Sequence, residues 1–137
     1  MLTPTFVRHA RLQPQLLGLR VLVVGAAATC AAIASELEEA GMTVREVVGA
    51  GRALYILEGR PALDVVVCTQ SLDSPRLDGL DVLEAARREV PDARRVLVGS
   101  PVVEPLERII LQHGPVDAIA WMPLEPGRVT AAVRRVA

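Results

Sequence analysis

Lysine and asparagine are both absent from this sequence of 137 residues, so all 15 of its basic residues are arginines. Without lysine, the protein cannot form a Schiff base through a lysine side chain. It also cannot hold a nucleotide with a phosphate loop of the Walker type, which needs a lysine. Without asparagine, it has no acceptor for N-linked glycosylation. These absences exclude several classes of catalysis and one modification.

Aromatic residues are scarce as well, since the chain has only Phe6, Tyr55 and Trp121. Hydrophobic residues nevertheless make up 51% of the sequence, so the core must consist of valine, leucine, isoleucine and alanine. That composition is typical of a buried parallel sheet that is covered by helices. The length corresponds to a single domain.

The charges nearly cancel, with 15 basic and 16 acidic residues. This balance does not favour a general attraction to nucleic acid or to an anionic membrane. We therefore expect no direct nucleic-acid partner and no membrane association. No helix-turn-helix or winged-helix pattern follows the last expected helix, which agrees with that expectation.

The two cysteines, Cys30 and Cys68, show neither a CxxC pattern nor a metal-ligand spacing, so we expect buried, reduced thiols and no metal site. An apolar run over residues 16–34 follows Arg8 and Arg11 and imitates an export signal. Arg20 interrupts this run, and a strand followed by a helix also explains it. We therefore expect a cytoplasmic protein.

Regular alternation begins after residue 18. Residues 1–18 contain Pro4, Pro14 and Gly18, and we interpret them as an N-terminal extension of a domain that spans 19–137. Short apolar runs predict strands over 21–25, 43–48, 65–69, 95–99 and 117–122. Amphipathic segments between them predict helices over 30–40, 51–58, 80–90, 103–113 and 126–136.

We expect Thr29 to cap the first of these helices, Asp78-Gly79 to open the third, and Tyr55 and Leu57 to face the core. Five strand–helix units predict an α/β fold, a flavodoxin-like, doubly wound (βα)5 three-layer sandwich with a five-stranded parallel sheet. Ligands of such sheets bind at the carboxyl ends of the strands.

Four segments, taken in this order, resemble the receiver domain of response regulators. They are 63–67 for its third strand, Asp78-Gly79-Leu80 for the start of its third helix, 96–100 for its fourth strand and Met122-Pro123-Leu124 for its Lys-Pro-Phe segment. The resemblance covers residues 19–137. It implies two-component signalling in a bacterial cytoplasm, in which a histidine kinase phosphorylates an aspartate.

That chemistry needs an acidic pair for Mg²⁺, an aspartate nucleophile and a lysine. The family pattern places the acids at about Gly25, Ala26 and Ala27, and the lysine at Met122. The aspartate position is Thr69 if counted from Asp64, or Ser71 if counted back from Asp78. Of the phosphate-binding residues only the hydroxyl of Ser100 is retained. The resemblance therefore implies a degenerate, aspartate-less pseudo-receiver with no cofactor, although Asp73 could still act as an unconventional phosphoacceptor.

Receivers signal through the surface of their fourth helix, fifth strand and fifth helix, which the resemblance places at residues 102–136. The candidate surface residues are Arg108, Gln112, His113, Trp121, Arg128, Arg134 and Arg135. They could meet another signalling protein, or a second copy in a homodimer. Arg134 and Arg135 could equally serve only to complement the negative end of a helix.

Two other functions remain open. Small residues over 25–29 could form a strand–loop–helix that senses a small ligand or an anion, although no GxGxxG pattern supports it. An enzyme would have to use Cys68, Thr69, Ser100 or His113, and none of these has a base at a plausible distance. We therefore expect a non-catalytic signalling domain that acts by protein–protein interaction.

Overall fold

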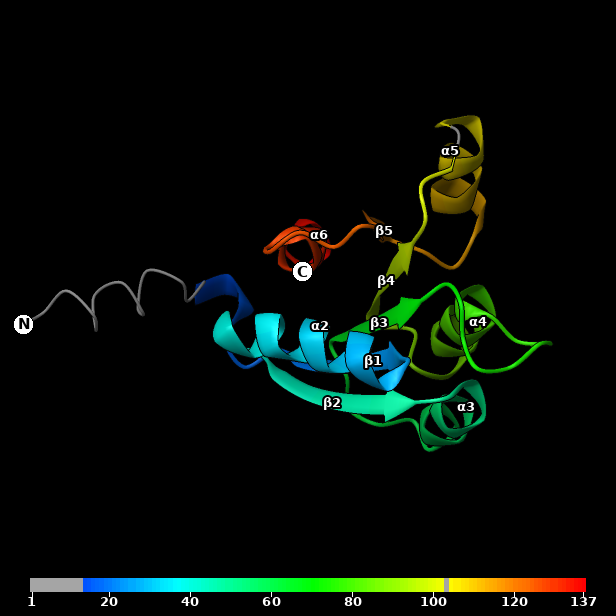
Figure 1. The fold of residues 1–137 in the computed structure, drawn as a ribbon. Helices are drawn as coiled ribbons and strands as arrows, with labels where there is room; N and C mark the ends of the chain where they lie inside the picture. Colours follow the sequence, from blue (N-terminus) through cyan, green and yellow to red (C-terminus); the bar gives the residue numbers. More distant parts are fainter. Residues whose placement is uncertain (1–13, 103) are drawn as a thin grey trace, which may run out of the picture.

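The computed structural model describes residues 14–102 and 104–137, and these form one parallel sheet with helices on both faces (Figure 1). The strand order is β2-β1-β3-β4-β5, with β1 (Arg20–Gly25), β2 (Thr43–Val48), β3 (Val65–Thr69), β4 (Arg94–Gly99) and β5 (Ala118–Trp121). The helices are η1 (Pro14–Leu16, a 3-10 turn), α2 (Ala27–Glu39), α3 (Ala50–Glu58), α4 (Gly79–Glu89), α5 (Glu104–His113) and α6 (Arg128–Val136). The predicted doubly wound α/β sandwich with five parallel strands is confirmed.

Alternation along the strands divides the core into two layers. In β1, Val21 and Val23 face α2 and α6, whereas Leu22 and Val24 face α3 and α4. The central strand β3 is buried on both faces from Val65 to Cys68, and β2 is a more exposed strand at the edge of the sheet. Both layers consist almost entirely of aliphatic side chains, because the chain has so few aromatic residues.

Two aspartates fix the register of the strand starts in the same way. The carboxylate of Asp64 accepts a hydrogen bond from the backbone N–H of Arg20 at 2.8 Å, while its own N–H donates to the Arg20 carbonyl. Asp117 and Arg95 repeat this pair of bonds between β5 and β4. The Arg20 guanidinium donates to Asp64 as well, and these hydrogen bonds lower the pKa of the Asp64 carboxyl. Each pair of bonds thereby aligns the starts of two neighbouring strands, β3 with β1 and β5 with β4.

The first long helix begins earlier than the sequence predicts. Thr29 does not cap it, because α2 already starts at Ala27 and its N-cap residue is Ala26, whose side chain makes no capping hydrogen bond. The run of alanines that we expected to be a loop is helical, which agrees with the high helix propensity of alanine. Asp78 does cap α4, with a reciprocal bond to Asp81. Strands β2 and β3 have the predicted boundaries, and the remaining boundaries lie within two residues of the expected ones. Residue 103, the expected start of α5, lies outside the described residues.

Tyr55 is also misplaced by the sequence prediction. Its side chain is 78% exposed, whereas Leu57 is fully buried. The buried face of α3 consists of Ala50, Ala53 and Leu57, and Tyr55 lies away from that face. A helix of alternating small and large apolar residues therefore does not reveal from its sequence alone which side is covered.

The chain enters the domain on the face that α2 and α6 cover. Leu16 of η1 is buried in the same core layer as these helices, and the Gly18 N–H donates to the Gly41 carbonyl just after α2. The apolar run 16–34 is thus η1, β1 and the first half of α2, as the strand-and-helix interpretation predicts. Within the described ranges, no helix combines the length and the hydrophobicity that a membrane crossing needs. Residues 1–13 of the expected extension lie outside the described residues.

Candidate functional site at the carboxyl ends of the strands

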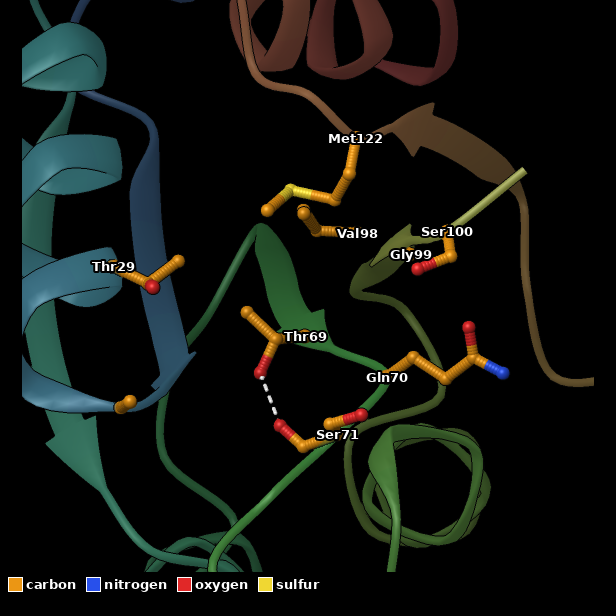
Figure 2. Close-up of a pocket in the computed structure, with 9 residues that line it drawn as sticks. Thr29, Thr69, Gln70, Ser71, Val98, Gly99, Ser100 and Met122 are labelled. Atoms are coloured by element: carbon orange, nitrogen blue, oxygen red, sulfur yellow. Dashed lines mark hydrogen bonds between the residues drawn. The ribbon is translucent and has the colours of Figure 1, made fainter.

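A hollow of about 280 Å³ opens where β1, β3, β4 and β5 end. It lies beside the point where the chain order of the sheet reverses, between β1 and β3, which is the usual ligand position in such folds. Nine residues line it, and Figure 2 shows the labelled ones converging from α2, from the ends of β3 and β4 with the segments after them, and from the residue after β5. The nine lining residues are Ala26, Thr29, Thr69, Gln70, Ser71, Val98, Gly99, Ser100 and Met122.

Four of the predicted site residues meet in this hollow, namely Ala26, Thr69, Ser100 and Met122. Two others do not line it. Gly25 lies beneath Thr69, since a Cβ built at Gly25 would come within 2.9 Å of the Thr69 Cγ2. Ala27 is exposed in the first turn of α2.

Two lining residues, Val98 and Gly99, were not predicted from the sequence, whereas Thr29 and Gln70 belong to the segments that follow the expected strands over 21–25 and 65–69. Thr29 was expected to be a helix cap, but it lies three residues after Ala26 in the first turn of α2 and so faces the same hollow. Val98 and Gly99 belong to the end of β4, and alternation with the buried Leu97 could have identified Val98. Gln70 directly follows β3, and its side chain packs across Gly99, where an ideal Cβ would meet its Oε1.

The two candidate positions for the nucleophile both reach the hollow. Thr69 is the last residue of β3, and its hydroxyl donates a hydrogen bond to the Ser71 carbonyl at 3.0 Å (Figure 2). Asp73, in contrast, does not line the hollow. Its Oδ1 accepts a hydrogen bond from the Ala50 N–H at 3.0 Å, and so it caps the N-terminus of α3. The nearby Gly49 has a positive φ of 103° and leaves room for this carboxylate.

None of the nine lining residues carries a charge, and their polar groups are hydroxyls, one amide and the backbone. Mg²⁺ is bound in proteins chiefly by carboxylates, together with water and substrate phosphates. Among residues 14–102 and 104–137, no group of three or more histidine, cysteine or acidic side chains is placed to hold a metal ion. The hollow can therefore offer hydrogen bonds to a ligand but no charged side chain.

The cysteines belong to the core. Cys30 and Cys68 are free and fully buried, as their apolar surroundings predict. Burial raises the pKa of both thiols, so they stay protonated at neutral pH and are poor nucleophiles. Cys68 faces α3 and α4 while its neighbour Thr69 faces the hollow, in line with strand alternation.

The predicted interaction surface has its cations partly engaged within the chain. Arg108 pairs with Glu104 at 2.8 Å, and Arg135 donates to the Ile119 carbonyl at 3.3 Å. Arg128 donates to the carbonyls of Trp121 and Pro123, on either side of Met122. Gln112, His113 and Arg134 are exposed, and Trp121 is half-buried against the core.

Helix α5 is the unusual element of this surface. None of its ten residues is buried, and Figure 1 shows it standing away from the sheet beyond the end of β4. Leu106, Ile109 and Leu111 are 44%, 55% and 38% exposed. Its sequence is amphipathic, so the expected helix is present, but its apolar side chains have little cover from the rest of the domain.

Comparison with solved structures identifies the fold. The chain is similar to a response regulator receiver protein from Sinorhizobium medicae WSM419, with 22% identity, a TM-score of 0.72 and coverage of 87% of this chain and 94% of that one. It is also similar to the chemotaxis protein CheY4 of Vibrio cholerae, with 16% identity, a TM-score of 0.73 and coverage of 88% and 99%. A CheY-like receiver domain protein from Methanospirillum hungatei JF-1 gives 21% identity, a TM-score of 0.71 and coverage of 87% and 93%.

No protein-family model and no curated protein matches the sequence. At these identities the likeness defines the architecture, and the chain has the fold of response-regulator receiver domains.

Proposed function

We propose that this chain is a cytoplasmic, receiver-like signalling domain that acts by binding another protein, without phosphorylation on aspartate and without enzymatic activity. The observation that carries the proposal is the uncharged hollow at the place of the family's phosphorylation site. Phosphoryl transfer depends on positioned charges that neutralise the transferred group, and Thr69, Ser100 and Met122 supply none. Asp73 is engaged at the N-terminus of α3, which argues against its use as a substitute.

Titration with Mg²⁺ and then beryllofluoride tests the missing phosphorylation. Beryllofluoride mimics a phosphoryl group, and we expect no saturable amide shifts at Thr69, Ser100 or Met122, because no carboxylate lines the hollow. NMR amide spectra of the full chain provide the measurement. The variant with Ala26→Asp, Thr69→Asp and Met122→Lys serves as the positive control, since all three positions face the hollow. Saturable shifts in the natural chain that disappear in Asp73→Ala would restore an aspartyl switch.

The surface for the partner is proposed to comprise α5, β5 and α6. Its apolar part is the exposed side chains of α5, and its cations are Arg108, Arg128, Arg134 and Arg135. An exposed apolar group beside charged residues is typical of a protein interface. The partner is either a second copy of this chain or another signalling protein, and the next experiment distinguishes the two.

Ile109→Glu is expected to abolish association through this surface, because it places a charge within the apolar part of α5. Sedimentation velocity over a range of concentrations measures self-association. A dimer that is lost in Ile109→Glu identifies a second copy as the partner, whereas a monomer at all concentrations points to another protein. Tyr55→Glu is the matched control, because Tyr55 is 78% exposed but lies on α3. A dimer that survives Ile109→Glu and is lost in Tyr55→Glu would contradict the proposed surface.

The second candidate function, the sensing of a small ligand, has one observation in its favour. The N-terminus of α2 borders the hollow, and its N-cap residue Ala26 provides no side-chain hydrogen bond to the first N–H groups. Inorganic phosphate added in the same NMR experiment tests this alternative. Shifts confined to Ala26, Thr29 and Ser100 would favour it.

A further inference from the structure

A second hollow lies between the later turns of α2 and the segment that leads into α6. Its volume is about 300 Å³. The two helices cover the same face of the sheet, and Figure 1 shows them on that face. The apolar lining is Ala32, Ile33, Leu124, Pro126 and Val129, and the polar lining is Ser35, Glu36, Glu39 and Glu125. We refer to this site as the α2–α6 groove.

The groove has an acidic rim. Glu36 is already engaged, because its carboxylate accepts hydrogen bonds from Gly127 and Thr130. Glu39 is the exposed last residue of α2, where the helix dipole adds further negative potential. Glu125 has an ion pair with Arg128 at 3.2 Å, but its side chain is 70% exposed, and such surface pairs are weak. The chemistry of the groove therefore suits an occupant with apolar side chains next to cations.

Residues 1–13 of this chain have that chemistry. They contain Arg8, His9 and Arg11 and no acidic residue, and Phe6 and Val7 precede these cations. The described chain starts directly after them at Pro14, on the face of the sheet that carries the groove. Leu16 is buried in the same core layer as Ile33 and Val129.

The reach of this segment is sufficient. Thirteen extended residues span roughly 40 Å, whereas all of α2 is about 20 Å long. A tether of this length also keeps the segment at a high effective concentration near the groove, so weak contacts are enough to hold it.

We propose that residues 1–13 dock in the α2–α6 groove, with Phe6 and Val7 against the apolar lining and Arg8 and Arg11 toward Glu39 and Glu125. The inference does not depend on the proposed function, since the groove shares no residue with the hollow at the strand ends or with α5.

A spin label at residue 3 tests the docking in the full chain. Cys30 and Cys68 are fully buried, so a nitroxide reagent applied to the Thr3→Cys variant reacts at the new cysteine. We expect selective loss of the amide signals of Ala32, Glu39 and Glu125. The loss should disappear in 1 M salt, where the Debye length falls to about 3 Å. It should also disappear in the Arg8→Glu, Arg11→Glu variant and return when Glu39→Arg and Glu125→Arg are added to it.

Three results would overturn the proposal. The first is no signal loss at the groove, and the second is loss spread evenly over the surface or centred on Leu106 and Ile109. The third is loss that appears in an unlabelled ¹⁵N chain mixed with a spin-labelled one, because the occupant is then a second copy. Glu58→Gln on α3 is the control for changes of charge, and it should leave the pattern unchanged. The first two results leave the interpretation of the beryllofluoride and sedimentation experiments unchanged. The third is a self-association, and it differs from association through α5 because its signal loss is centred on the groove and not on Ile109.

Discussion

Replacing Gly79 with alanine is expected to destabilise the domain strongly. Gly79 is the first residue of α4, and its N–H donates to the Gln70 carbonyl at 2.8 Å. A Cβ built there would overlap the carbonyl oxygen of Thr69 and lie 2.8 Å from its carbonyl carbon. Both neighbours are backbone atoms of the chain as it leaves the central strand, so neither can move without disturbing β3. We expect a loss of about 3 kcal/mol or more in the free energy of unfolding.

Gly51→Ala is the matched control for this substitution. Gly51 also lies in the first turn of a helix, α3, but a Cβ there meets nothing within 4 Å. Because alanine favours helix more than glycine does, the control should be neutral or more stable by up to about 1 kcal/mol. Denaturant unfolding of both variants measures the difference. Equal stability of the two variants would contradict the close packing of Gly79 against the Thr69 carbonyl.

The same glycine shows how far the sequence alone could go. The pair Asp78-Gly79 predicted the start of a helix, and the helix starts there with the expected cap. The close approach to Thr69 was not predictable, because it depends on how the loop over residues 70–77 brings α4 back onto β3. Local signals thus located the element, and the tertiary packing explains why glycine is needed.

The candidate site was predictable to a similar extent. The ends of the strands can be predicted from the apolar runs and the glycines that follow them. The sequence therefore predicted Ala26, Thr69, Ser100 and Met122 as site residues, and all four line the hollow. The orientation of Asp73 toward α3 was not readable, because it rests on a hydrogen bond to Ala50, 23 residues earlier. This long-range hydrogen bond holds Asp73 at α3, so its carboxylate does not line the hollow.

Helix α5 illustrates a different reason for failure. Its amphipathic sequence predicts a helix with one covered face, but no residue of α5 is fully buried, and Ile110 is only partly buried against the core. Periodicity reports that a face is apolar without reporting what covers it, and a partner serves that role as well as a sheet does. An amphipathic helix whose apolar face stays largely exposed is therefore more informative about function than one that is packed.

Replacing Glu36 with glutamine is expected to lower the free energy of unfolding by about 2 kcal/mol. Glu36 lies on α2, yet its carboxylate accepts three hydrogen bonds at the start of α6. The donors are the Gly127 N–H at 3.0 Å, the Thr130 N–H at 2.7 Å and the Thr130 hydroxyl at 2.6 Å. Gly127, the N-cap residue of α6, has no side chain and a positive φ of 86°, so it cannot cap the helix itself. Glutamine removes the charge that complements the helix N-terminus and replaces one acceptor with an N–H group.

Glu38→Gln provides the control, because Glu38 is an exposed residue of the same helix. Its substitution should change the free energy of unfolding by less than about 0.5 kcal/mol. Urea unfolding followed by circular dichroism measures both variants, and hydrogen exchange of the Thr130 amide reports on the start of α6. Equal stability of the two variants, with unchanged exchange at Thr130, would contradict the capping role. If Glu36→Gln has the lower free energy of unfolding, the start of α6 is stabilised by a residue that lies 94 positions before Thr130 in the chain. The start of α6, which belongs to the proposed interaction surface, then depends on a residue of α2, so the geometry of that surface is coupled to α2.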